Sequence, residues 1–87
     1  MTWTVIFTRN ADKDLENINP ADREPIIRKA AALAENPRPA GVKKLAGADD
    51  LYRVRVGRYR IIYQIQERIV TVIIVRIRHR KDVYRNL

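Results

Sequence analysis

The stretch from Leu51 to Ile77 constrains the fold of this chain most, because its apolar and polar residues alternate. It reads LYRVRVGRYRIIYQIQERIVTVIIVRI and is rich in valine, isoleucine and tyrosine, which favour β-strands. Gly57 and the polar pair Glu67-Arg68 interrupt the alternation where turns are expected. We therefore predict an antiparallel meander of three strands, close to residues 51–56, 59–66 and 71–77.

Arginines recur on one alternation parity of these predicted strands. Because successive side chains of a strand point to opposite faces, each strand turns its arginines to one side. Five arginines belong to this set: Arg53, Arg55, Arg60, Arg76 and Arg78. The other side is apolar and includes Tyr52 and Tyr63, which we expect in the core. The middle strand is apolar on both faces, so we expect it at the centre of the sheet.

The residues before the meander predict a strand and a short helix. Residues 3–7 (WTVIF) are β-branched and aromatic, which favours a strand. Apolar residues recur at helical spacing over 11–18, and either Thr8 or Asn10 is suited to cap this helix. The helix therefore has one apolar stripe to pack on the sheet.

A second helix follows directly. Asn19 is a favoured cap, Pro20 is tolerated at the first helical position, and an apolar face continues to about residue 35. Residues 37–50 predict a loop. The expected fold class is α+β, with an N-terminal strand, a two-helix hairpin packed on one face of a small, mostly antiparallel sheet, and a short C-terminal tail.

Composition predicts one domain over residues 1–87, because a chain of this length holds a single hydrophobic core. There is no cysteine and only one histidine, so we expect neither a disulfide nor a metal site. No glycine-rich phosphate loop is present, and we expect no small-molecule cofactor. No apolar run approaches membrane-spanning length, so the natural expectation is a soluble cytoplasmic protein.

The net charge of +8 is concentrated in the second half of the chain. Residues 1–50 hold eight basic and eight acidic side chains, whereas residues 51–87 hold ten basic and two acidic ones. Clustered cations bind polyanions by neutralising phosphates and releasing counterions. The charge pattern therefore favours a nucleic acid partner, and Lys43 and Lys44 of the loop are candidates to contact phosphates.

A cluster of arginines suits the cleavage of RNA. The 2′-hydroxyl of RNA can attack the adjacent phosphorus, so an enzyme needs no metal if it orients that group and stabilises the transition-state charge. Arginine forks fit the phosphate oxygens. The tail adds His79 and Tyr84, which can move protons or stack on a base. The residues alone also fit a solvated strand face, and they lead no further than a basic domain whose sheet faces RNA or DNA.

Three segments carry a resemblance to a known family. They are KKLAG at 43–47, LYRVRVGRYRIIYQI at 51–65 and RHRKDVY at 78–84. These segments resemble the toxins of the RelE/ParE superfamily, specifically its RelE branch. The expected order of a strand, two helices, a meander and a basic tail is also that family's layout.

The resemblance implies a toxin of a bacterial or archaeal toxin–antitoxin pair that enters the ribosomal decoding site and cleaves mRNA there. The family's products end in a 2′,3′-cyclic phosphate and a 5′-hydroxyl. The implied partners are a cognate antitoxin of the RelB type, the ribosome and mRNA.

The resemblance also implies catalytic roles for five residues: Arg55, Arg60, Arg78, His79 and Tyr84. Arg60 matches the arginine that binds the scissile phosphate, Arg78 matches one that stabilises it, and Tyr84 matches the tyrosine that stacks on the codon base. Family members commonly have a lysine, cast as the general base, at the position of Arg55. An arginine is almost never deprotonated, so His79 becomes the candidate base.

Seven other basic residues are expected to contact the RNA: Lys43, Lys44, Arg53, Arg58, Arg76, Arg80 and Lys81. Two other functions stay open. The superfamily's other branch poisons DNA gyrase and generally lacks this set of basic residues and tyrosine. The third possibility is a basic RNA-binding or ribosome-binding module without catalysis.

Overall fold

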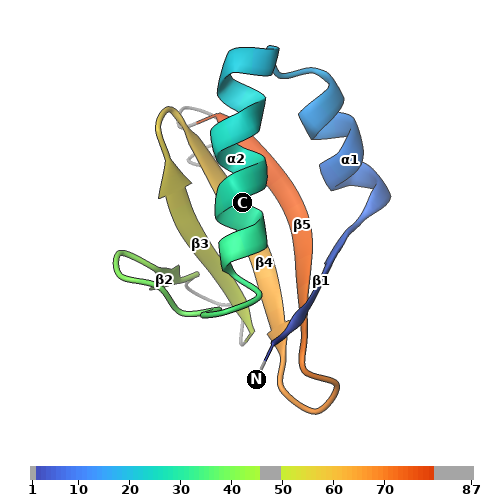
Figure 1. Cartoon of the computed structure of the whole chain (residues 1–87), viewed down its shortest axis with the longest axis vertical. Helices are drawn as coiled ribbons and strands as arrows, with labels where there is room; N and C mark the ends of the chain where they lie inside the picture. Colours follow the sequence, from blue (N-terminus) through green and yellow to red (C-terminus); the bar gives the residue numbers. More distant parts are fainter. Residues whose placement is uncertain (1, 46–49, 80–87) are drawn as a thin grey trace.

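A computed structural model of the chain describes residues 2–45 and 50–79, which form two helices and a five-stranded sheet (Figure 1). The elements in chain order are β1 (Thr4–Phe7), α1 (Arg9–Glu16), α2 (Pro20–Ala32), β2 (Lys43–Lys44), β3 (Leu51–Val56), β4 (Tyr59–Gln66) and β5 (Thr71–His79). The predicted α+β class is confirmed.

The strands are ordered β1-β5-β4-β3-β2 across the sheet. Strand β1 runs parallel to β5, and the other neighbours are antiparallel. The predicted meander of β3, β4 and β5 is confirmed, and β4 lies at the centre of the sheet. The turn between β3 and β4 lies at Gly57, which has a φ of 58°. A glycine adopts this φ without the clash that a Cβ would cause.

Two strand assignments differ from the sequence prediction. Strand β2 lies within the predicted loop, because two residues are too few to show an alternation. Strand β5 continues to His79 instead of ending at Ile77, because pairing with β4 persists as far as Tyr59. Both differences add basic residues to the sheet, namely Lys43 and Lys44 in β2 and Arg78 at the end of β5.

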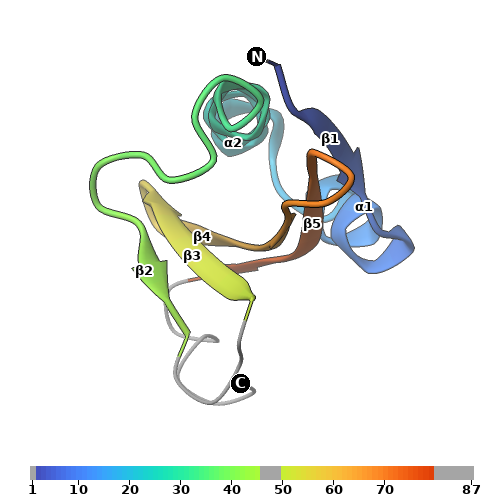
Figure 2. The same ribbon diagram turned by 90° about the horizontal axis from the view of Figure 1, so that it is seen from below.

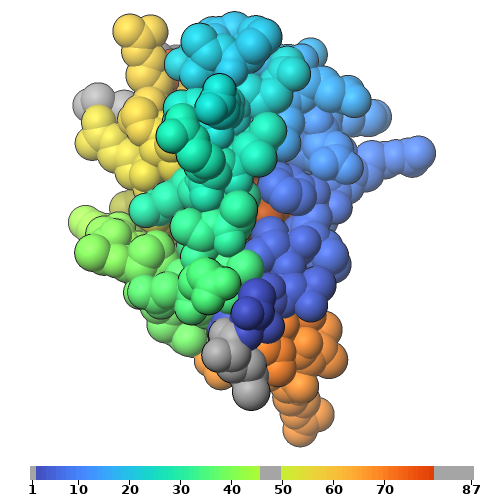
Figure 3. All heavy atoms as spheres, in the orientation of Figure 1, coloured from blue at the N-terminus to red at the C-terminus, as the bar shows by residue number. Residues whose placement is uncertain are grey.

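The helix hairpin spans the sheet from its centre to its edge (Figures 1 and 2). Helix α2 crosses one face, and in Figure 3 its atoms and those of the following segment cover the middle of that face. Helix α1 lies beside β5, beyond the end of β1. In the part of the chain that the structure describes, no helix has the length and apolar character needed to cross a membrane.

Both predicted helix caps are present. The Oγ1 atom of Thr8 accepts a hydrogen bond from the backbone N–H of Ala11 at 3.1 Å, and Asn19 accepts one from Asp22 at 3.0 Å. These side chains satisfy backbone donors that have no partner within a helix. The helices end at Glu16 and Ala32, two and about three residues earlier than predicted.

The core lies between the helix hairpin and the covered face of the sheet. Its buried members are Ala11, Ile18, Ile26, Ala30, Leu33, Val54, Ile61, Tyr63, Ile65, Val72, Ile74 and Ile77. Burying each large aliphatic side chain contributes about 1.5–3 kcal/mol relative to exposing it. Packing against the helices holds the strands in place, so the opposite face can present its side chains in fixed positions.

The two tyrosines predicted for the core pack against each other. Tyr63 is fully buried and its hydroxyl donates to the carbonyl of Pro37 at 2.7 Å, while Tyr52 is half-buried with its ring centroid 6.0 Å from that of Tyr63. Arg38 lies 5.4 Å over the Tyr52 ring and pairs with Glu67 at 2.6 Å. These contacts fasten the segment after α2 to the sheet.

Candidate nucleic-acid interface

Three arginines form one row across the face of the sheet opposite α2. Arg55 on β3 lies opposite Arg60 on β4, and Arg60 lies opposite Arg78 on β5. Residues opposite each other in antiparallel strands have side chains on the same face, about 4.5–5.5 Å apart at Cβ. The structure therefore brings together three of the residues predicted to be catalytic.

A second row runs parallel to the first. Lys43 lies opposite Arg53, Arg53 lies opposite Ile62, and Ile62 lies opposite Arg76. Ile62 is only 1% exposed although it lies on the face opposite α2, outside the core cluster. On this face, basic side chains therefore surround one buried isoleucine.

A hollow of about 190 Å³ opens between these rows and the segment before β2. It is lined by Gly41, Lys43, Arg53, Arg55 and Arg60. A water molecule occupies about 30 Å³ of liquid, so the hollow has room for a phosphate group. A wider, shallower hollow lies between α2 and β3 and shares Arg55 with the first.

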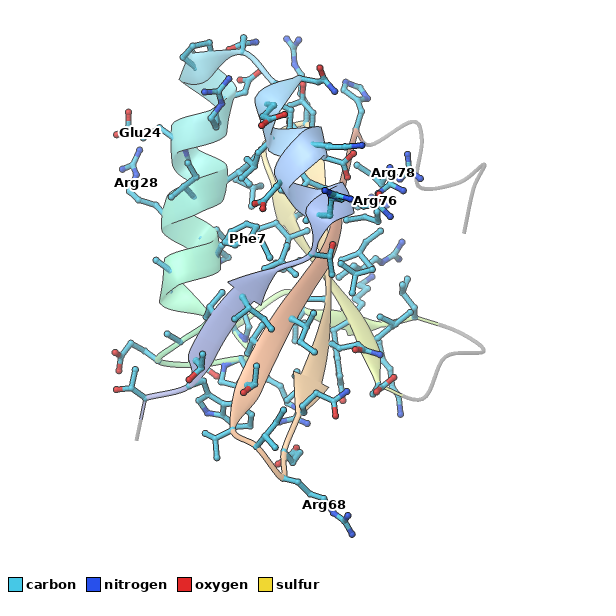
Figure 4. The ribbon with its side chains drawn as sticks, turned by 90° about the vertical axis from the view of Figure 1, so that its right-hand side faces the viewer. Phe7, Glu24, Arg28, Arg68, Arg76 and Arg78 are labelled. Carbon is cyan, nitrogen blue, oxygen red and sulfur yellow. The ribbon has the colours of Figure 1, made fainter. Side chains whose placement is uncertain are left out.

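A β-bulge in β5 decides which face its last residues occupy. Tyr63 pairs with Ile74 but Ile62 pairs with Arg76, so Val75 is an extra residue. Before the bulge Ile74 is buried in the core, and after it Ile77 is. One extra residue exchanges the two faces of a strand. Arg76 and Arg78 consequently lie on the side of the sheet away from α2 (Figure 4).

Arg76 is engaged by an acidic residue that the sequence analysis did not identify. Its Nε and Nη2 atoms donate to Asp14 of α1 at 2.9 and 3.1 Å, and the Asp14 side chain is only 17% exposed. The hydrogen bond to Asp14 raises the pKa of Arg76 above its ordinary value. Asp14 comes from the N-terminal half of the chain and not from a neighbouring strand. The contact of Arg76 with RNA stays a prediction.

Arg78 has a different environment from Arg76. Its Nε atom is buried, and within residues 2–45 and 50–79 no hydrogen-bond acceptor contacts it. A buried donor without an acceptor is destabilising by about 1–3 kcal/mol. A bound phosphate oxygen would supply such an acceptor.

His79 lies on the other parity of β5 from Arg78. It is opposite Tyr59, and the two rings meet edge to face with centroids 5.4 Å apart. Tyr59 packs against the core. The structure therefore does not bring His79 into the arginine row, and its role in proton transfer stays a prediction.

The remaining predicted residues are spread more widely. Arg58 is exposed in the turn between β3 and β4, and Lys44 lies opposite Tyr52, on the other parity from Lys43. Arg80, Lys81 and Tyr84 lie outside the described residues. Among the described residues, no group of three or more histidine, aspartate and glutamate side chains is arranged to hold a metal ion.

A family of known proteins matches almost the whole chain. The family model described as the ParE toxin of the type II toxin–antitoxin system parDE matches residues 5–84. Toxin RelG of Mycobacterium tuberculosis is 35% identical over 89 residues, which cover 98% of this chain and 99% of the relative. The mRNA interferase toxin RelE of Escherichia coli is 28% identical over 88 residues, which cover 97% and 92% of the two chains.

The fold is also shared with a toxin solved together with its antitoxin. The archaeal RelE–RelB complex from Pyrococcus horikoshii contains a chain that is 29% identical, with a TM-score of 0.81. The match covers 92% of this chain and 97% of that one.

Proposed function

The chain belongs to the ParE toxin family of type II toxin–antitoxin systems, and we propose that it is a RelE-like mRNA interferase, an endoribonuclease that cleaves mRNA. The observation that carries the proposal is the row of Arg55, Arg60 and Arg78, with Arg55 and Arg60 also lining the hollow. A like-charged row is unfavourable in the free protein and becomes favourable when phosphate binds.

The proposed reaction is an internal attack within the RNA. The 2′-oxygen bonds to the adjacent phosphorus, the bond from phosphorus to the 5′-oxygen breaks, and the products end in a 2′,3′-cyclic phosphate and a 5′-hydroxyl. The 2′-hydroxyl gives up one proton, and the departing 5′-oxygen takes one. The attacking group belongs to the RNA, so the route needs no metal-bound water.

The arginines stabilise charge in this reaction. Arg60 is the central member of the row and lines the hollow, so it binds the scissile phosphate. Arg55 and Arg78 flank it and stabilise the negative charge that builds on the phosphate oxygens. Arg55 acts only electrostatically and not as a base. Lys43 and Arg53 hold the neighbouring phosphates of the strand.

We propose three macromolecular partners, which are an antitoxin, the ribosome and mRNA. A toxin of this family is controlled by its antitoxin, and the similarity to a RelE solved with RelB supports a RelB-like antitoxin for this chain. The substrate is mRNA on the ribosome, in the cytoplasm, with the cut made in the A site. The whole chain, residues 1–87, acts as one toxin domain.

The test is a defined translation system with a ribosome stalled on a known mRNA. Mapping of the new 5′ ends after addition of the protein is expected to show cuts confined to the A site. The same RNA without ribosomes measures how far cleavage depends on the ribosome. Absence of cleavage by a folded protein would contradict the proposal.

The description of the matching family suggests a second candidate function. The superfamily's other branch poisons DNA gyrase, and the family model is described by its ParE member. A supercoiling assay with purified gyrase separates the two functions. Inhibition of gyrase without cleavage of mRNA would assign the chain to that branch.

A further inference from the structure

Helix α1 and its N-cap residue Thr8 form three hydrogen bonds with the backbone of β5 around the bulge. The N–H and the Oγ1 of Thr8 donate to two successive carbonyls, those of Ile74 at 3.0 Å and of Val75 at 2.8 Å. Successive carbonyls of a regular strand point to opposite sides, so two that reach one residue mark the distortion of the bulge. Thr8 therefore holds the bulge at its first half.

Asp14 holds the second half of the bulge. Its Oδ2 atom accepts from the backbone N–H of Ile77 at 2.9 Å and from Arg76, whose second nitrogen donates to Oδ1. Strand β1 has ended by this point, so Asp14 supplies the acceptor that a neighbouring strand would otherwise give. Thr8 and Asp14 lie at the cap and in the body of one helix.

The bulge determines whether Arg78 belongs to the arginine row. Without the extra residue, the alternation that buries Val72 and Ile74 would turn Arg76 and Arg78 toward the core. With it, Arg78 lies opposite Arg60. The contacts from α1 thus act on the row through the backbone of β5, although neither Thr8 nor Asp14 is in the row.

We propose that Thr8 and Asp14 are positioning residues of the cleavage site, because α1 holds the bulge of β5 and the bulge holds Arg78 beside Arg60. This inference rests on the proposed function. It assigns to the first helix a role in catalysis that is separate from its role in covering the core.

The test uses conservative variants and a matched control. Asp14→Asn removes the charge that pairs with Arg76, and Thr8→Val removes the hydroxyl at constant size, while Thr8→Ser keeps it. Glu24→Gln is the control, because it neutralises the carboxylate of an exposed ion pair with Arg28 on α2, at 3.7 Å. The single-turnover cleavage rate and the affinity for the ribosome complex are measured separately.

Asp14→Asn and Thr8→Val are expected to lower the cleavage rate on the order of 10-fold, because small misplacements of a catalytic group are costly. Affinity should change little, and Thr8→Ser and Glu24→Gln should retain the parent rate. In an Arg78→Ala background the loss from Asp14→Asn should shrink to about twofold or less, because the effect passes through Arg78. An equal loss in both backgrounds, or no loss in either, would overturn the inference.

A measurement that does not depend on cleavage separates this inference from the proposed function. The NMR signal of the Arg78 Nε–H is followed in protein with labelled arginine. A changed signal in Asp14→Asn, with no change in Glu24→Gln, supports the positioning role even if the parent cleaves no RNA. An unchanged signal in both variants would contradict it.

Discussion

Arg60 and Arg78 lie directly opposite each other on the antiparallel strands β4 and β5, on the face of the sheet opposite α2. Like charges in this arrangement destabilise a sheet, so the row that suits a phosphate weakens the free protein. Arg78→Gln is expected to raise the free energy of unfolding by about 0.5 kcal/mol and to lower the cleavage rate on the order of 100-fold. Thermal unfolding and single-turnover cleavage measure the two effects.

The control for this prediction is Arg68→Gln. Arg68 lies in the turn between β4 and β5, at the far end of the molecule from Arg78 (Figure 4). Arg68→Gln should change neither the free energy of unfolding nor the cleavage rate. An Arg78→Gln protein that is less stable than its parent would show that the arginine contributes more by packing than it loses by repulsion.

Tyr63 makes stability depend on pH in alkaline solution. Burial raises the pKa of its hydroxyl from 10.0 to about 12. Between these values the unfolded chain loses the proton and the folded chain keeps it. The stabilising contribution of Tyr63 to the free energy of unfolding is therefore complete below pH 10 and is lost as the pH rises toward about 12. The free energy of unfolding should fall by up to about 1.4 kcal/mol per pH unit from this group.

Tyr63→Phe is the matched variant, measured by denaturant unfolding across the same pH range. It should be less stable than the parent near neutral pH by about 1–3 kcal/mol, because the carbonyl of Pro37 loses its donor. The difference between the two proteins should narrow in alkaline solution. A constant difference would mean that Tyr63 titrates alike in both states.

Val70 adopts a backbone conformation that its side chain disfavours. Its φ is 48°, in the left-handed region, where a β-branched residue is a steric outlier. Val70→Gly is expected to stabilise the protein by about 0.5–1 kcal/mol, measured as a higher midpoint in denaturant. Ile69→Gly is the control in the same turn. Because Ile69 has no such φ, its replacement should stabilise nothing, and equal gains would exclude relief of strain as the cause.

The cations around the hollow should set the salt dependence of RNA binding. Each phosphate contact to single-stranded RNA contributes about 0.7 to the slope of log affinity against log salt concentration. Lys43→Ala and Arg53→Ala should each lower the slope by that amount, whereas Arg68→Ala should leave it unchanged. The measurement is a titration of a short RNA at several salt concentrations. Equal slopes for all three variants would show that the RNA does not bind at this hollow.

Much of the fold followed from local patterns in the sequence. The alternation over residues 51–77 predicted three strands and their order. Asn19 was predicted as a helix cap, and Thr8 was one of two candidates for the other. The parallel pairing of β1 with β5 was not predicted, because a pairing of distant segments leaves no local signal. The two-residue strand β2 was missed because it is too short to alternate.

The site was predicted less completely than the fold. The parity of Arg53, Arg55 and Arg60 was read correctly from alternation alone. Alternation does not reveal the bulge at Val75, so no local pattern explains why Arg78 joins the row rather than the core. Asp14 was missed because it appears as one more polar residue of a short helix, and only the tertiary structure brings it to β5.

The most direct test of the account is the single-turnover rate of mRNA cleavage by Arg60→Ala, compared with Arg68→Ala on the same stalled ribosome. Arg60→Ala is expected to lose on the order of 100-fold to 1000-fold in rate, because it removes the central cation of the row. Arg68→Ala should cleave at the parent rate. Cleavage by Arg60→Ala at the parent rate would contradict the claim that the arginine row is the active surface.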